Sequence, residues 1–408
     1  MAQTPVSPEF VIVGGGPVGW WLAIQLRKRR QDCRVTVYER YDTYQRSHVL
    51  QLDHWSMLLY GRNRKSSGDA LQDEFYREVT GKDLSGVAWS PTRSLFIRTN
   101  DFEVALRRYA LALGVHLVTR RVERVEDVEA LHPDCRHFIA ADGAHSMMRA
   151  QLLGPNAVKE HPLQHVVEVK YQVKGPAARL KALPLQLAVN RKLQHMAFEY
   201  VGREREGVCP VTLRFFVSPQ VYAAVPEASF KKPLAVDAPG LPAALRDDIS
   251  AYMAHRNGEG GELYCQNSGN VTKLVLSLYS ARRFSVERDG RSWFITGDAA
   301  MGVPYFRALN SGMILSSRLA QILCSKTWPV RGRLDRQMFF YNVHRPMHIQ
   351  TEFSIARGKN FALKLFDWTR QVAGAIEAGQ LSGELAAEGQ ELSSLAWAVD
   401  CRPKHSES

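Results

Sequence analysis

The chain has 408 residues, of which 45% are hydrophobic and 23% are charged. This length permits two or three domains or one large composite fold, and the composition excludes a globally disordered chain. The net charge of +12 favours anionic partners such as phosphorylated cofactors or acidic substrates, and no zinc-finger or basic-aromatic nucleic-acid motif accompanies it.

Cysteine spacing and apolar runs indicate the cellular compartment. The six cysteines are scattered and form no CxxC pair, which predicts reduced thiols in a reducing compartment. The opening MAQTPVSPEF lacks the basic and apolar regions of a signal peptide, and no apolar run reaches the length of a membrane helix. We therefore expect a cytoplasmic protein without a transmembrane segment.

Strand, helix and strand patterns follow one another at the start of the chain. The apolar, β-branched residues 10–14 predict a buried parallel strand, and residues 19–30 predict a helix with a basic last turn. Residues 34–39, RVTVYE, predict the second strand. Together these segments predict a βαβ unit.

The next clear element is an amphipathic helix over residues 100–113. Asn100 and Glu103 fit a capping box at its start, and Gly114 fits its end. Strand-like segments follow, with the sequences VHLVT, VERVED and HFIAADG.

The pattern then changes to short strands separated by turns, and later to helix. We expect an antiparallel β-rich domain over residues 163–285, inserted between parts of an α/β domain at 1–162 and 286–330. Residues 331–408 are expected to form a helical C-terminal region. Its acidic end, from Ile376 to Asp400, is predicted to be helical and to dock on the basic body of the protein.

Three glycines between the first strand and the first helix carry the strongest chemical signal. Gly14, Gly16 and Gly19 form GxGxxG, in which small residues allow a tight turn, a close approach of a pyrophosphate and close packing of helix on strand. Glu39 ends the second strand, where an acid can hold adenosine ribose hydroxyls. The ordered set predicts dinucleotide binding.

Two further clusters follow in the order of a known family. One is ADGAHSMMR, which contains Asp142, and the other is FITGDAAMGVPYFRALNSGM, which contains Gly297, Asp298 and Gly312. With these motifs the sequence resembles the FAD-dependent aromatic hydroxylase-type (group A) flavoprotein monooxygenases, from Phe10 to about Pro346. The segments RSHVLQLDHW and ALALGVHLV look similar to the MICAL and kynurenine-monooxygenase branch.

The resemblance implies a set of residues that bind non-covalent FAD, namely Gly14, Gly16, Gly19, Glu39, Arg46, Arg98, Val122, Asp142, Asp298, Asn310, Ser311 and Gly312. Val122, on a strand, would flank the adenine, and Asp298 would bond ribityl or ribose hydroxyls. Backbone N–H groups from Asn310 to Gly312, in a helix that starts near Leu309, would face the flavin pyrimidine edge. Such a helix start stabilises the negative charge of reduced flavin.

The implied fold is α/β: a Rossmann-type FAD-binding domain with an inserted antiparallel β-rich substrate domain and a helical C-terminus. The implied activity is hydroxylation of a small aromatic or anionic substrate, with NAD(P)H, O2 and a flavin C4a-hydroperoxide. Tyr305, Phe306 and Arg307 are expected to face the substrate. The sequence names no catalytic acid or base, and His344 and His348 lack a third metal ligand, so we expect no metal site.

The last motif departs from the family pattern. Met301 stands where the family commonly has histidine, and Arg307 and Ala308 replace glycines. Three alternatives therefore stay open: a non-oxygenating flavin oxidoreductase such as an isoprenoid double-bond reductase, a MICAL-like enzyme that oxidises a protein, and a non-catalytic flavin-binding regulator.

Overall fold

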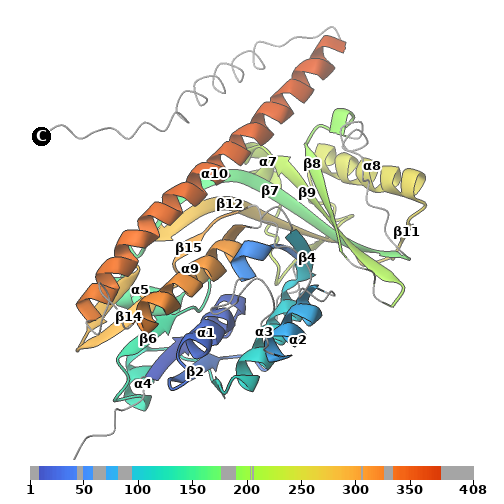
Figure 1. The fold of residues 1–408 in the computed structure, drawn as a ribbon. Coiled ribbons are helices and arrows are strands. Elements are labelled where there is room, and N and C mark those ends of the chain that lie inside the picture. Colours follow the sequence, from blue (N-terminus) through green and yellow to red (C-terminus); the bar gives the residue numbers. More distant parts are fainter. Residues whose placement is uncertain are drawn as a thin grey trace, which may run out of the picture. The chain divides into compact units, whose positions relative to one another are not determined.

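The computed structural model describes residues 9–43, 49–57, 70–80, 94–175, 190–202, 204, 206–304, 307–325 and 334–377. Its chain forms two compact units. The first comprises Met1–His161 and Leu278–Phe353, and the second comprises Pro162–Ser277 and Ser354–Ser408. The chain therefore passes from the first unit to the second, returns, and enters the second again within its last helix (Figure 1).

The first unit is built on a six-stranded sheet with the order β13-β14-β6-β1-β2-β5. All neighbouring strands are parallel except β13 and β14. The strands are β1 (Glu9–Val13), β2 (Arg34–Glu39), β5 (His116–Thr119), β6 (His137–Ala140), β13 (Ser285–Arg288) and β14 (Arg291–Ile295). The central strands read as continuous apolar runs because a parallel sheet is covered on both faces.

Helices and short elements complete the first unit. The helices are α1 (Pro17–Arg29), α2 (Ala70–Thr80), α3 (Thr99–Ala112), α4 (Val125–Leu131), α5 (Met147–Leu153), α9 (Arg307–Cys324) and the first part of α10 (Leu334–Glu377). The short elements are β3 (Val49–Asp53), η1 (His54–Met57), β4 (Ser94–Arg98), η2 (Gly297–Ala299) and β15 (Met301–Gly302). Strands β3 and β4 pair antiparallel.

Helix α1 lies between α3 and α9 and is buried along most of its length. Its two indoles are fully buried, and each N–H has a partner. Trp20 Nε1 donates to Glu103 Oε1 of α3 at 2.8 Å, and Trp21 Nε1 donates to Ser317 Oγ of α9 at 2.9 Å. These bonds satisfy groups whose burial would otherwise be costly.

Two local expectations were wrong. Helix α3 begins at Thr99, so Arg98 and not Asn100 is its N-cap, no side chain caps it, and the Glu103 carboxylate accepts from the Trp20 indole instead. The VERVED segment is not a strand: α4 starts at Val125, whose helix buries Val128 and has two acids in its first turn. Acids at that position favour a helix through its dipole.

The second unit carries most of an antiparallel sheet with the order β10-β12-β7-β9-β8, in which β11 pairs with β7. Its elements are β7 (Val158–Lys174), β8 (Ala197–Val201), β9 (Val208–Val217), α7 (Pro219–Ala224), β10 (Leu234–Ala235), α8 (Ala243–Gly260), β11 (Leu263–Tyr264) and β12 (Asn270–Ala281). Burial alternates along β9, which is typical of a sheet with one core face. That face packs with Leu245, Ile249 and Tyr252 of α8.

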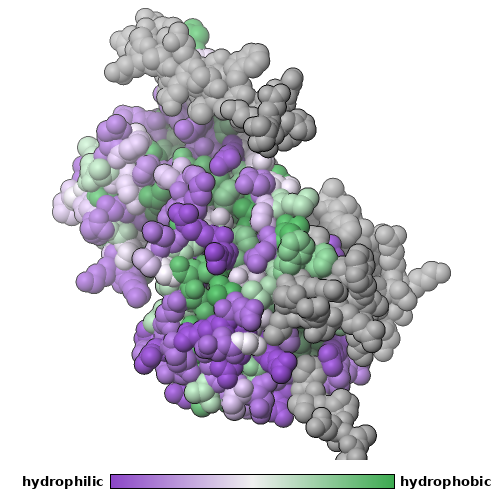
Figure 2. All heavy atoms as spheres, turned by 90° about the vertical axis from the view of Figure 1, so that its left-hand side faces the viewer, coloured by the Kyte–Doolittle hydropathy of each residue, from purple (hydrophilic) through white to green (hydrophobic). Residues whose placement is uncertain are grey.

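The fold class expected from the sequence is confirmed. A mainly parallel sheet, an antiparallel sheet that the chain inserts into the α/β part, and a long C-terminal helix are all present. Figure 2 shows one face of the molecule, on which hydrophilic side chains predominate around a smaller hydrophobic area. Among the described residues, no helix combines the length and the apolar character that a membrane span requires.

Candidate cofactor-binding site

The turn between β1 and α1 requires glycine at position 14. Gly14 has a φ of 112°, a conformation that L side chains rarely adopt. A Cβ there would lie 2.4 Å from the carbonyl oxygen of Ala141. The first glycine motif therefore lies against the residue that precedes Asp142 in the second motif.

The start of α1 is uncapped and has no negative charge of its own. Gly16 is its N-cap, no side chain caps it, and its first turn contains no acidic residue. Gly19 lies so close to the loop that a Cβ would approach the Gly14 carbonyl oxygen to 2.0 Å. The N–H groups of a first helical turn have no intrahelical partner and form the positive end of the dipole. Phosphate groups bind at such helix starts.

A carboxylate is fixed beside this loop. Glu39 Oε2 accepts a hydrogen bond from the Gly15 N–H at 2.8 Å, and Oε1 accepts from the N–H groups of Arg40 and Tyr41 at 2.8 and 3.1 Å. Three bonds leave part of the acceptor capacity of a carboxylate, which has about four lone-pair sites. Glu39 is thus oriented and able to accept a further hydroxyl.

Asp142 points to the start of α5. Its two oxygens accept from Ser146 Oγ at 2.5 Å and from the Met148 N–H at 3.2 Å. Burial raises the pKa of the Asp142 carboxyl. Ser146 in turn caps α5 by accepting from the Arg149 N–H at 2.9 Å. The acid of the second motif therefore stabilises its own loop.

Arg149 connects the second motif to the third. Its guanidinium is buried and donates to the carbonyl oxygens of Ala144 and Ala299, both at 2.8 Å. At the adjacent residue, Asp298, the backbone carbonyl oxygen accepts a hydrogen bond from the Tyr279 hydroxyl at 2.8 Å. These bonds fix the backbone of the Gly297–Asp298 segment from two sides.

The side chain of Val18 is the point where the first and third motifs meet. A Cβ on Gly297 would lie 3.0 Å from Val18 Cγ1, and one on Gly312 would lie 2.8 Å from Val18 Cγ2. Gly297 also has a φ of 59°. The structure therefore brings the three glycine motifs together around the start of α1.

Helix α9 begins at Arg307 within the described residues, two positions earlier than expected. In an α-helix that starts there, the N–H groups of Ser311 and Gly312 bond to carbonyls one turn earlier. The Asn310 side chain has another role: its Oδ1 accepts from the Asp53 N–H and the Ser56 hydroxyl, at 2.9 and 2.8 Å.

Arg307 has a protein carboxylate as its partner. Its Nε and Nη2 donate to the two oxygens of Glu352 on α10, at 2.5 and 2.8 Å. This bidentate bond raises the pKa of the Arg307 guanidinium. His348 Nε2 lies 3.7 Å from Glu352, and burial lowers the pKa of His348. The cation expected to meet the substrate is thus already paired.

The remaining predicted residues lie at the edges of this arrangement or outside it. Arg98 is half-buried at the junction of β4 and α3. Val122 is half-buried between β5 and α4, and not on a strand as expected. Arg46, Tyr305 and Phe306 lie outside the described residues.

Sequence reasoning missed Val18 and Glu352. Val18 fills a variable position of GxGxxG, between Gly16 and Gly19, and Glu352 lies far along the chain from the residue that it contacts. No pattern in the sequence points to either of them. Among the residues that the structure describes, no group of three or more His, Cys, Asp or Glu side chains could hold a metal ion.

Comparisons with known proteins identify the fold. No family model and no curated protein sequence matches the chain. Many solved structures do match, at low identity. CtdE, solved with FAD and a substrate, has a TM-score of 0.56 and 13% identity, with 96% of this chain and 100% of CtdE covered.

Two other matches are enzymes with different chemistries. The anhydrotetracycline hydroxylase OxyS from Streptomyces rimosus has a TM-score of 0.52 and 17% identity, over 98% of this chain and 78% of OxyS. The Diels-Alderase PyrE3 of pyrroindomycin biosynthesis has a TM-score of 0.54 and 17% identity, over 91% of this chain and 78% of PyrE3. The chain shares the fold of these proteins.

Proposed function

We propose that the protein binds FAD and uses NAD(P)H and O2 to hydroxylate a small organic substrate. The observation that carries this proposal is the convergence of the three glycine motifs on the uncapped start of α1, with the oriented Glu39 carboxylate beside it. The same fold in CtdE, which was solved with FAD, and in a hydroxylase supports the proposal.

The residues present fit FAD. The pyrophosphate would bind the N–H groups at the start of α1, where Gly16 leaves the backbone uncovered. Glu39 would accept an adenosine ribose hydroxyl, and Asp298 would bond the ribityl chain. The start of α9 would stabilise negative charge on the flavin through N–H groups that precede those of Ser311 and Gly312.

When bound, the flavin supplies the redox chemistry and the activation of O2. The protein's own task is then to hold the substrate and to exclude water from the reacting atoms. Because Arg307 is paired with Glu352, a substrate anion would have to compete with a buried carboxylate for it. We therefore favour a neutral aromatic substrate over an anionic one, with Tyr305 and Phe306 as proposed contacts.

The proposal is tested by identifying the cofactor and the fate of oxygen. Denatured protein should release FAD, and a screen of small aromatic compounds should find some that accelerate NAD(P)H oxidation. The product formed under ¹⁸O2 should carry one labelled oxygen atom. Release of FMN, or a protein that cannot be reconstituted with any flavin, would refute the cofactor assignment.

Gly16→Val separates cofactor binding from folding. Gly16 has φ and ψ of −71° and 176°, which any residue adopts without strain, so a side chain there does not distort the turn itself. The variant should keep its secondary structure and melting temperature in the absence of flavin, yet lose FAD. Gly14→Ala is the contrasting variant: its φ of 112° should make it lose stability as well.

A second candidate is a flavoprotein that does not transfer oxygen. PyrE3, a Diels-Alderase, has the same fold, and Arg307 and Ala308 replace glycines in the third motif. An isoprenoid reductase or a flavin-binding regulator would contain FAD but give no ¹⁸O-labelled product. A MICAL-like enzyme would oxidise a protein substrate or release H2O2 without a small aromatic substrate.

A further inference from the structure

The second half of α10 exposes a regular apolar stripe. The stripe residues recur at alternating spacings of three and four, and we call them the α10 stripe: Ile355, Gly358, Ala362, Leu365, Thr369, Val372 and Ile376. Ile355, Leu365 and Ile376 are 37%, 40% and 63% exposed. This spacing is that of the a and d positions through which two helices pack side by side.

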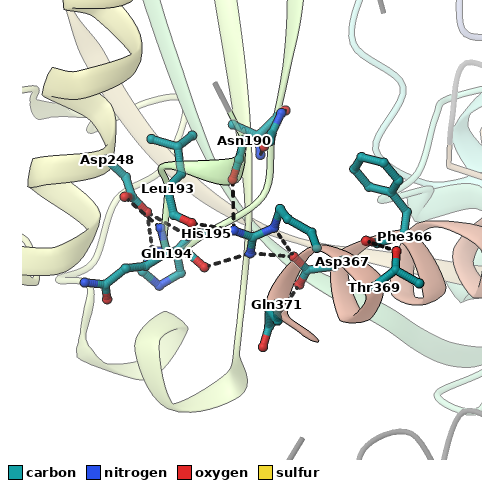
Figure 3. Close-up of polar contacts among 11 residues, drawn as sticks. Asn190, Leu193, Gln194, His195, Asp248, Phe366, Asp367, Thr369 and Gln371 are labelled. Carbon is teal, nitrogen blue, oxygen red and sulfur yellow. Dashed lines mark hydrogen bonds and ion pairs between the residues drawn. The ribbon is translucent and has the colours of Figure 1, made fainter. Parts of the chain in front are cut away.

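The opposite side of the same helix is already anchored within the second unit. Arg370 donates to the carbonyl oxygens of Asn190 at 2.9 Å, Leu193, and Gln194 at 3.1 Å, and pairs with Asp367 at 2.7 Å. Figure 3 shows Asn190, Leu193 and Gln194 opposite Asp367 of α10. Anchoring by Arg370 fixes which side of α10 faces outward, and the α10 stripe lies on that side.

The chain that follows α10 has a matching pattern. Its residues Leu381, Leu385, Glu388, Leu392, Leu395 and Val399 are spaced alternately by four and three, and all but one are apolar. We call this set the tail stripe. A helix over residues 381–399 would place the whole tail stripe on one side.

The two stripes are in register if the tail folds back. An antiparallel arrangement with a turn at residues 378–380 brings together, in order, Ile376 with Leu381, Val372 with Leu385, Thr369 with Glu388, Leu365 with Leu392, Ala362 with Leu395, and Gly358 with Val399. Gly358 and Ala362 of α10 thus meet Val399 and Leu395 of the tail, the other three apolar pairs join two large side chains, and the one acid meets the one hydroxyl. A turn of this length that contains Gly379 is typical of two antiparallel neighbouring helices.

Charge favours the same pairing. Lys359 lies beside the α10 stripe, and Arg357 and Lys364 lie farther round the same helix. Between residues 378 and 400 the tail has four acids and no Lys or Arg, the acids being Glu384, Glu388, Glu391 and Asp400. Opposite charges along the flanks of two packed helices favour their association.

We propose that residues 381–399 form a helix that packs antiparallel on the α10 stripe, as a helical hairpin within the second unit. Gly383 and Gly389 lower the helix propensity of this segment, so the helix depends on docking for its stability. The tail then covers an apolar surface that would otherwise be exposed to solvent.

Disulfide trapping in the full-length protein tests the register. Cys265, Cys324 and Cys401 are first changed to Ser, and Ala362→Cys is combined with Leu395→Cys. Mild oxidation should crosslink this pair within one chain about tenfold faster than the control pair Ala362→Cys with Ser394→Cys, whose second residue faces away. Equal rates, or a crosslink between two chains, would overturn the proposal, the latter because a second copy would then occupy the stripe.

Hydrogen exchange gives a second test that leaves the body of the protein unchanged. Leu392→Asp places a charge in the tail stripe, and Ser393→Asp places the same charge on the outward side. Only Leu392→Asp should increase amide exchange in residues 381–399, by about tenfold or more, since undocking removes the support of that helix. Equal exchange in the two variants, or rapid exchange of the unaltered tail, would contradict docking.

Discussion

The close approach of Gly312 to Val18 predicts that the effect of Gly312→Ala on stability depends on the residue at position 18. In Gly312→Ala the new Cβ would lie 2.8 Å from Val18 Cγ2. This is about 0.7 Å closer than the shortest favourable carbon–carbon separation of about 3.5 Å. Overpacking of this kind destabilises a protein by about 1–3 kcal/mol, and replacing a helical glycine by alanine stabilises it by about 1 kcal/mol. Gly312→Ala should therefore destabilise the protein by about 0–2 kcal/mol.

Val18→Ala removes the methyl groups that cause the overlap. In that background Gly312→Ala keeps only the gain in helix propensity and should stabilise the protein by about 0.5–1 kcal/mol. Val18→Ala alone should cost about 1 kcal/mol, since it removes two partly buried methyl groups. The flavin content of these variants should follow the order of their stability, because Gly312 and Val18 position α9 against the start of α1.

The assay is thermal unfolding of the four proteins of the cycle, in which 1 kcal/mol corresponds to about 2–4 °C for a unit of 150–250 residues. Gly374→Ala is the control, because nothing lies within 4 Å of a Cβ at that helical glycine. It should stabilise the protein equally in both backgrounds. If Gly312→Ala has the same effect in the parent protein and in the Val18→Ala variant, within about 0.5 kcal/mol, the reasoning is refuted.

Three further predictions concern charge and titration. Burial lowers the pKa of His137 to about 4, so between pH 4 and 6.5 the unfolded state binds more protons than the folded state. The free energy of unfolding should therefore fall by up to about 3 kcal/mol as the pH drops through that window. His137→Gln should flatten this part of the pH profile in thermal unfolding. Arg307→Gln should lower the free energy of unfolding by about 1.5–3 kcal/mol because it leaves Glu352 buried without its partner, and adding Glu352→Gln should recover part of that stability. If Arg307→Gln instead raises the Michaelis constant for anionic substrates and leaves stability unchanged, Arg307 contacts the substrate. Asp298→Ala should weaken the binding of FAD by about 1.5–3 kcal/mol in a fluorescence titration, whereas the exposed control Asp237→Ala should leave the binding unchanged. Equal effects of the two substitutions would count against the ribityl contact.

The sequence by itself determined the elements that depend on neighbouring residues. The strand, glycine turn, helix and strand at the start of the chain follow from apolar runs and from a turn that needs a positive φ at Gly14. Gly114 ends α3 as expected, with a φ of 80°, for the same local reason. The alternation along β9 likewise depends on a period that is visible in the sequence.

Pairings between distant residues were decided only by the tertiary structure. The capping pattern of Glu103 is sound as a local signal, but a buried indole N–H requires an acceptor, and Trp20 takes that carboxylate. Arg307 meets Glu352 for the same reason, since a buried carboxylate is stable only with a partner. Residues far apart in the chain become partners through the packing of whole helices, and no local period records which ones will meet.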